Sequence, residues 1–142
     1  MVQRKIIVLV LLILLSGCDI RKETYCRYEL APFKMEVFFT SLYNRLVAMR
    51  VLSQVDLTRM HFSKEDTKDY IEAFLKANEN FKDYIEVEVQ QNVLTITERY
   101  PLDDQNFLAK CAKSQYLNYQ EGRSLNLLLT IEEMHKLGFD CQ

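Results

Sequence analysis

The strictest constraint on the fold lies between positions 84 and 100, where apolar and polar residues alternate on both sides of Gln91-Asn92. The apolar positions are Ile85, Val87 and Val89 before this pair, and Leu94, Ile96 and Tyr100 after it. Side chains of a β-strand point alternately to its two faces, so the pattern predicts two strands, each with one buried face. Gln91-Asn92 suits a tight reversal, and the segment is therefore expected to form a β-hairpin.

Three acidic residues of this hairpin could suggest general acid-base catalysis, which often uses paired carboxylates. They are Glu86 and Glu88 in the first strand and Glu98 in the second. The alternation places Glu86 and Glu88 on the polar face of their strand, where a solvated surface explains them more simply. We therefore assign them no catalytic role.

Three earlier segments are also predicted to be strands, namely residues 24–30, 35–41 and 47–57. The third shows the longest alternation, with one face formed by Val47, Met49, Val51, Val55 and Leu57. Its other face carries Arg50, Gln54 and Asp56, which is typical of an antiparallel sheet with one solvated face. Pro32 and Asn44 mark the reversals between the segments.

Residues 64–78 are predicted to form an amphipathic helix that covers one face of this sheet. Ser63 can accept hydrogen bonds from the first amides, and Glu65 and Asp66 fall in the first turn, where the helix dipole favours negative charge. Apolar residues follow at helical spacing: Tyr70, Ile71, Phe74 and Leu75. The expected fold class is α+β, an antiparallel sheet with one main helix packed on a face and a short C-terminal helix.

The remainder of the chain is predicted to contain a short helix at residues 103–110, a long polar loop at 113–123 and a short buried strand at 125–128. Tyr116 and Tyr119 make this loop the best candidate for a partner-contact surface, because long loops often carry function.

A short helix at residues 131–137 is expected to close the domain. Thr130 and Glu133 have the spacing of a capping box, in which each side chain satisfies an amide at the helix start. Gly138 can adopt the left-handed conformation that ends a helix, and Phe139 is expected to pack back against the domain.

The cysteines of the domain leave three disulfide pairings open: Cys111 with Cys141, or Cys26 with either of them. An oxidising compartment favours one disulfide and one leftover thiol, which is the only nucleophile worth considering for an enzyme. No pair has the C-x-x-C spacing of a metal site, and His61 and His135 have no ligand neighbours in sequence. The sequence therefore predicts no metal and no other cofactor.

The N-terminus has the pattern of an export signal. Arg4-Lys5 precedes an apolar run over residues 6–15, which is too short to span a bilayer. The next residues, Leu15-Ser16-Gly17-Cys18, resemble the lipobox of bacterial lipoproteins. Cleavage between Gly17 and Cys18 would remove residues 1–17 as a signal peptide and leave the Cys18 thiol to carry a diacylglycerol.

The expected organisation is a lipidated tether at residues 18–23 followed by a single domain at 24–142. The protein is thus expected on the extracytoplasmic side of a bacterial membrane. Asp19 resembles a signal that retains lipoproteins in the inner membrane, which favours the outer face of that membrane.

Charge argues against a nucleic-acid partner. Two of the 18 basic residues lie in the signal peptide, so the mature chain has 16 basic residues against 20 acidic ones. Arg21, Lys22 and Arg27 are a local exception close to the anchor. They either touch anionic headgroups or belong to a solvated tether.

This order of elements resembles the YehR-like family of small bacterial lipoproteins. The resemblance is carried by the lipobox, the antiparallel strands, the helix that begins at Ser63, the polar hairpin and the closing Leu137-Gly138-Phe139. It implies an α+β domain with a helix packed on an antiparallel sheet, and it brings no activity or catalytic residues. The chain departs from the family pattern in its three mature cysteines and in Leu42-Tyr43-Asn44, where a glycine-containing turn is expected.

Two functions are compatible with these features. The first is a non-enzymatic, membrane-tethered binding or accessory domain that acts on an envelope partner, since the sequence shows no catalytic triad, phosphate loop or metal spacing. The alternative is a carrier of a small apolar ligand. Its pocket would lie between helix 64–78 and the sheet, lined by Phe39, Ile71, Phe74 and Ile85.

Overall fold

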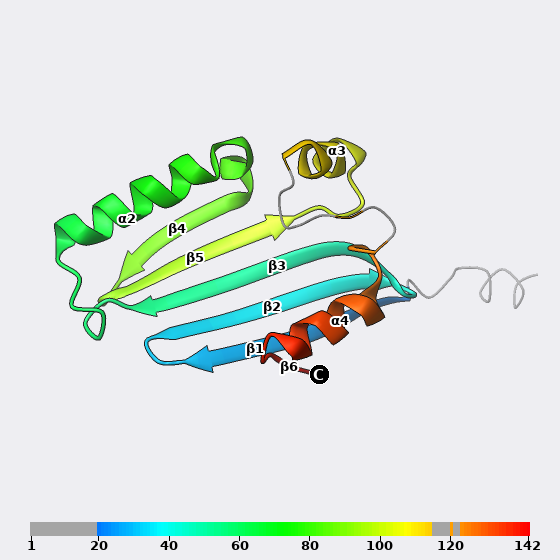
Figure 1. The fold of residues 1–142 in the computed structure, drawn as a ribbon, viewed down its shortest axis with the longest axis horizontal. Coiled ribbons are helices and arrows are strands. Elements are labelled where there is room, and N and C mark those ends of the chain that lie inside the picture. The colour runs from blue at the N-terminus through cyan, green and yellow to red at the C-terminus, as the bar shows by residue number, and fades with distance from the viewer. Residues whose placement is uncertain (1–19, 115–119, 121–122) are drawn as a thin grey trace, which may run out of the picture.

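The structure, a computed structural model, describes residues 20–114, 120 and 123–142. It consists of a six-stranded antiparallel sheet with its described helices packed on one face, an α+β fold as predicted (Figure 1). The elements in chain order are β1 (Arg21–Leu30), β2 (Phe33–Leu42), β3 (Arg45–Asp56), α2 (Lys64–Ala77), the 3-10 helix η1 (Glu79–Tyr84), β4 (Ile85–Gln90), β5 (Val93–Tyr100), α3 (Gln105–Ser114), α4 (Leu127–Lys136) and β6 (Asp140–Cys141).

The strands lie in the order β4-β5-β3-β2-β1-β6, so consecutive hairpins build most of the sheet. The predicted hairpin is confirmed as β4 and β5. Gln91 and Asn92 connect these strands with φ values of 48° and 64°, the left-handed conformations that a two-residue hairpin turn requires. Tyr43 and Asn44 occupy the equivalent positions between β2 and β3, and Tyr43 has a φ of 55°.

The first strand is longer than predicted. β1 begins at Arg21 and pairs with β2 as far as Leu42, so residues 21–23, which were expected in the tether, belong to the sheet. The reason is that β2 also runs to Leu42 and offers ladder hydrogen bonds along its whole length. A partner strand can order a polar segment that has little apolar alternation of its own.

A register shift in the β2–β3 pair corrects the predicted core face of β3. The shift falls between Thr40 and Ser41, so Ala48 pairs with Thr40 while Leu46 pairs with Ser41. Val47 is the extra residue of this bulge and is only half-buried, whereas Leu46 is buried. One inserted residue reverses the face of every side chain before it, which even spacing in the sequence does not reveal.

The helix at 64–78 is confirmed as α2, with Ser63 as its N-cap. The Ser63 hydroxyl accepts from the Asp66 N–H at 3.1 Å, and the Asp66 carboxylate accepts from the Ser63 N–H at 2.8 Å. The helix expected at 103–110 runs instead from Gln105 to Ser114, because the Asp104 carboxylate caps its first amides.

The C-terminal helix begins earlier than predicted. α4 starts at Leu127, so the short strand expected at 125–128 and the capping box of Thr130 and Glu133 are wrong. The Asn126 side chain is the cap and accepts from the Leu129 N–H at 3.1 Å. Starting there brings Leu127, Ile131 and Met134 to one face of the helix, where they join the core.

The end of α4 follows the prediction. Gly138 has a φ of 90°, and its N–H and that of Phe139 donate to the carbonyls of His135 and Met134, each at 3.0 Å. Phe139 packs against Tyr28 with ring centroids 5.4 Å apart. This reversal directs the last residues back along β1, where they form β6.

The face of the sheet that carries the helices, the covered face, holds two hydrophobic clusters. One lies under α2 and is centred on Val55, Leu57, Ile85, Leu94 and Ile96. The other contains residues of α3, α4 and η1 together with Cys26, Val37, Phe39, Leu46, Val51 and Tyr100. The opposite face, the open face, contributes no buried hydrophobic residue from the described strands.

Candidate functional site

The predicted lipidation position, Cys18, and the predicted cleavage position, Gly17, lie outside the described residues, as does the whole predicted signal peptide. The same holds for Tyr116 and Tyr119, the tyrosines of the predicted contact loop. What the structure adds is the proximity of Cys18 to the fold, because β1 begins only three residues after it.

The disulfide joins Cys26 and Cys141, one of the three pairings left open by the sequence. The S–S distance is 2.05 Å, and the two residues lie opposite each other in the register of β1 and β6. The backbone supports this pairing: the Tyr25 N–H donates to the Gln142 carbonyl at 3.0 Å, and the Gln142 N–H donates to the Tyr25 carbonyl at 2.7 Å. Spacing in sequence could not identify this pairing, because the two-residue strand β6 forms only by pairing with β1.

The leftover cysteine, Cys111, is buried in the cluster under α3 and α4. Burial raises the pKa of its thiol. A nucleophilic cysteine needs exposure and a lowered pKa, so the environment of Cys111 is the reverse of what that chemistry requires.

A cavity of about 620 Å³ lies between α3, α4 and the covered face of β2 and β3. Buried Phe39 and Leu46 contribute to its apolar lining, together with Met49 and Met134. Exposed Arg123 and Glu133 contribute polar groups. A hydrogen bond from Lys136 lowers the pKa of Glu133, so its carboxylate is charged near neutral pH.

The four residues expected to line a ligand pocket are not brought together. Phe39 belongs to the cluster under α3 and α4, whereas Ile71, Phe74 and Ile85 belong to the cluster under α2. In that second cluster the side chains of α2 pack directly on the sheet. A more open pocket of about 960 Å³ does lie between α2 and the β4–β5 turn, and of the four expected residues Ile71 alone lines it. The cavity beneath the C-terminal helix α4 is a second pocket, at a position that the sequence did not indicate.

The three glutamates of the hairpin separate onto the two faces of the sheet. Glu86 and Glu88 are exposed on the open face, as predicted, and Glu86 forms an ion pair with Arg99 at 2.7 Å. Glu98 lies on the covered face, where it pairs across the sheet with Val51 and Ile85. They therefore do not form one carboxylate pair.

Glu98 was considered from the sequence, but its position on the covered face was not predicted. Burial raises the pKa of its carboxyl group, against the opposing effect of the Tyr100 hydroxyl, which donates to it at 2.8 Å. The signal was present in the sequence, because position 98 alternates in phase with Ile96 and Tyr100.

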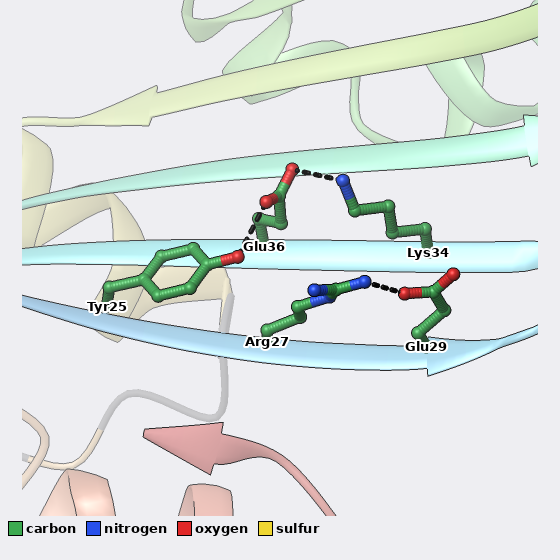
Figure 2. Close-up of polar contacts among 5 residues, drawn as sticks. All are labelled: Tyr25, Arg27, Glu29, Lys34 and Glu36. Atoms are coloured by element: carbon green, nitrogen blue, oxygen red, sulfur yellow. Dashed lines mark hydrogen bonds and ion pairs between the residues drawn. The ribbon is translucent and has the colours of Figure 1, made fainter. Parts of the chain in front are cut away.

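The open face carries a polar network across β1 and β2 (Figure 2). The Tyr25 hydroxyl donates to Glu36 at 2.6 Å, and Lys34 forms an ion pair with the other oxygen of Glu36 at 3.1 Å. The hydrogen bond from Tyr25 is the main cause of the lowered pKa of Glu36. Arg27 and Glu29 form a second pair beside it.

An aromatic and cationic row crosses the same face next to this network. The Tyr25 and Phe38 rings lie 5.0 Å apart, and the Arg50 guanidinium lies 4.2 Å from the centre of the Phe38 ring. Arg50 pairs directly across the sheet with Arg99. Opposed like charges are unfavourable in a sheet, and the ion pair with Glu86 offsets the charge of Arg99.

Metal binding finds no support within residues 20–114 and 123–142, where no group of three His, Cys, Asp or Glu side chains could hold an ion. In the same described part of the chain, no helix has the length and apolar character needed to cross a membrane. No family model matches the chain, and neither does any curated protein or solved structure. Membership of the YehR-like family stays a prediction.

Proposed function

We propose that this chain is a lipid-anchored bacterial envelope protein whose single α+β domain serves as a non-enzymatic binding or accessory module. The observation that carries the proposal is the position of Cys18, at the end of a lipobox and three residues before the first strand of a disulfide-linked fold. The Cys26–Cys141 disulfide supports export, because such bonds persist in oxidising compartments. Asp19 favours the outer face of the inner membrane.

The surroundings of the Cys111 thiol and of the hairpin carboxylates support a non-enzymatic role. The Cys111 thiol is buried with a raised pKa, and the carboxylates of Glu86 and Glu98 lie on opposite faces of the sheet. Neither arrangement offers a reactive group to a substrate in the way that nucleophilic or acid-base catalysis requires.

The lipid anchor is tested by Cys18→Ala in cells supplied with labelled fatty acid. The variant is expected to lose the label and to keep residues 1–17, whereas Cys111→Ala, a matched control inside the domain, is expected to be labelled and processed normally. Normal labelling of Cys18→Ala would contradict the lipoprotein proposal.

The partner is sought by crosslinking the anchored protein in intact cells and identifying captured proteins by mass spectrometry. We expect one envelope protein to be enriched over a control in which the same lipobox anchors an unrelated domain. Recovery of no envelope protein above that control would contradict an accessory role on a protein partner.

A second candidate function, transport of a small apolar ligand, is favoured by the cavity beneath α4. Its volume of about 620 Å³ falls within the range of small-molecule pockets. The probe N-phenyl-1-naphthylamine can be titrated into residues 20–142, which contain all the described elements and the disulfide. Leu129 lines the cavity and its neighbour Leu128 does not, so Leu129→Trp is expected to weaken binding while Leu128→Trp leaves it unchanged. Equal binding by both variants would exclude the cavity beneath α4 as the ligand site.

A further inference from the structure

The distance between the predicted lipid and the fold is short. Cys18 precedes Arg21, the first residue of β1, by three residues. Three extended residues span at most about 10 Å. If Cys18 carries lipid, as the proposed function states, the end of the sheet at which β1 begins must stay close to the membrane surface.

The tip of the β2–β3 hairpin lies at this same end of the sheet. Arg21 pairs with Leu42, and Leu42 pairs with Arg45 across the turn. The tip is unusually apolar for a solvated turn, because Leu42 is 40% exposed and Tyr43 is 74% exposed. Tyrosine is enriched where proteins meet the interface of a membrane.

The start of α4 adds a further apolar side chain to this end. Asn44 holds it in place: the Leu127 N–H donates to the Asn44 carbonyl at 2.9 Å, and the Leu128 N–H donates to the Asn44 side chain at 3.2 Å. Leu128 itself points outward and is 69% exposed. Two elements distant in sequence thus present apolar side chains beside the point where the chain continues to Cys18.

The open face is polarised in charge along its strands. In the half nearest Cys18 the charged residues are Arg21, Glu23, Arg45, Arg50 and Arg99. In the far half they are Arg27, Glu29, Lys34, Glu36, Asp56, Glu86 and Glu88. The first set is predominantly positive and the second predominantly negative, and this remains so when the ion pair that joins Arg99 of the first set to Glu86 of the second is left out.

We propose that this end of the domain is a second membrane contact, which docks on anionic phospholipid headgroups. The docking surface consists of Arg21, Leu42, Tyr43, Arg45, Arg50 and Leu128. Its arginines are attracted to an anionic surface within about one Debye length, roughly 10 Å at moderate salt, and the acidic far half is repelled from it. The exposed Leu and Tyr side chains enter the interfacial layer. The lipid and this surface together hold the sheet in one orientation.

The orientation is tested in the full chain reconstituted into vesicles of phosphatidylglycerol and phosphatidylcholine. The photoreactive residue p-benzoylphenylalanine is placed at position 43 or, as a matched control, at position 33. Phe33 is also an exposed aromatic residue, 45% exposed, but it lies at the opposite end of the sheet. Crosslinking to phospholipid is expected to be about fivefold higher at position 43 than at position 33.

Charge reversal separates electrostatic docking from simple proximity. Arg45→Glu combined with Arg50→Glu is expected to remove most of the difference in phospholipid crosslinking between positions 43 and 33. Arg27→Glu combined with Arg59→Glu makes the same change of net charge in or beside the far half and is expected to preserve it. Vesicles of phosphatidylcholine alone are expected to reduce the difference to the level of the Arg45/Arg50 variant.

Three results would overturn the docking surface: equal labelling at positions 43 and 33, a difference unaffected by the Arg45 and Arg50 changes, or crosslinking of position 43 to protein instead of phospholipid. The mass of the same samples shows whether Cys18 carries lipid. A lipidated chain with no preference for position 43 contradicts only this inference. A chain without lipid contradicts the proposed function, and labelling at position 43 in that chain would still support the docking surface.

Discussion

The covered and open faces are built from the same strands, yet they shift the pKa of a glutamate in opposite directions. On the covered face, Glu98 lies between Val51 and Ile85, and burial raises its pKa. On the open face, Glu36 accepts a hydrogen bond from Tyr25 and pairs with Lys34, and its pKa is lowered. The surroundings supplied by neighbouring strands, and not the residue type, decide which protonation state the fold favours.

The same contrast appears in the hydrophobic residues. Leu94 is buried on the covered face beneath α2, whereas Leu52 is only half-buried on the open face. Stability is therefore concentrated on one side of the sheet, which leaves the other side free to carry charge. The variants below test this division, beginning with the largest expected effect.

Removal of the disulfide, by Cys26→Ala combined with Cys141→Ala, should have the largest effect. The bond closes a sequence separation of 115 residues, and its loss is expected to lower the free energy of unfolding by about 4–5 kcal/mol on the loop-entropy estimate. Urea unfolding of residues 20–142 measures the change. Cys111→Ala, which removes a buried thiol and keeps the crosslink, should cost only about 1 kcal/mol; similar losses in the two proteins would contradict a stabilising role for the bond.

Truncation of one leucine on each face compares the faces directly. Leu94→Ala is expected to cost about 3 kcal/mol, because it leaves a cavity beneath α2. Leu52→Ala should cost about 0.5–1 kcal/mol, since its side chain already contacts solvent. Thermal unfolding of both variants, each compared with the unchanged protein, provides the measurement. Equal costs would show that the open face is covered in solution.

The two glutamates should have opposite effects on stability as pH changes. The raised pKa of Glu98 means that it contributes stability below the unfolded pKa and loses it as pH rises through the folded pKa. The lowered pKa of Glu36 means that it contributes stability above the unfolded pKa and loses it as pH falls through the folded pKa.

Glu98→Gln is therefore expected to remove a decrease in the free energy of unfolding as pH rises. Glu36→Gln is expected to remove an increase in the free energy of unfolding as pH rises. Urea unfolding from about pH 3 to about pH 7 covers both transitions. Glutamine keeps an acceptor for the tyrosine hydroxyl in each case, so the comparison isolates the charge. Changes of the same sign in the two variants would contradict the assignment of the glutamates to different environments.

The parts of the fold that could be predicted are those decided by neighbours in sequence. The β4–β5 hairpin follows from alternation around Gln91-Asn92, and α2 follows from helical spacing after Ser63. The closing turn at Gly138 is equally local. The N-cap of α4 is Asn126 and not the predicted Thr130, because a helix that begins at Leu127 places this side chain in the core.

The candidate sites were harder to predict because they depend on contacts between distant segments. The Cys26–Cys141 pair required β6 to add to β1. The cavity required α3 and α4 to lie above β2 and β3. The burial of Glu98 was not predicted, although its alternation with Ile96 and Tyr100 in β5 places it on the covered face. The predicted contact tyrosines, Tyr116 and Tyr119, fall outside the described residues.

The sequence by itself determined the α+β class, the hairpin, the helix α2 and the expectation of a lipid on Cys18, because each depends on spacing within a few residues. Tertiary structure alone decided which cysteines pair, where the cavity lies and which end of the sheet gathers arginines beside an apolar tip. These features join residues that are far apart in the chain, such as Asn44 and Leu128. Only the packing of helices on one face of the sheet brings such residues together.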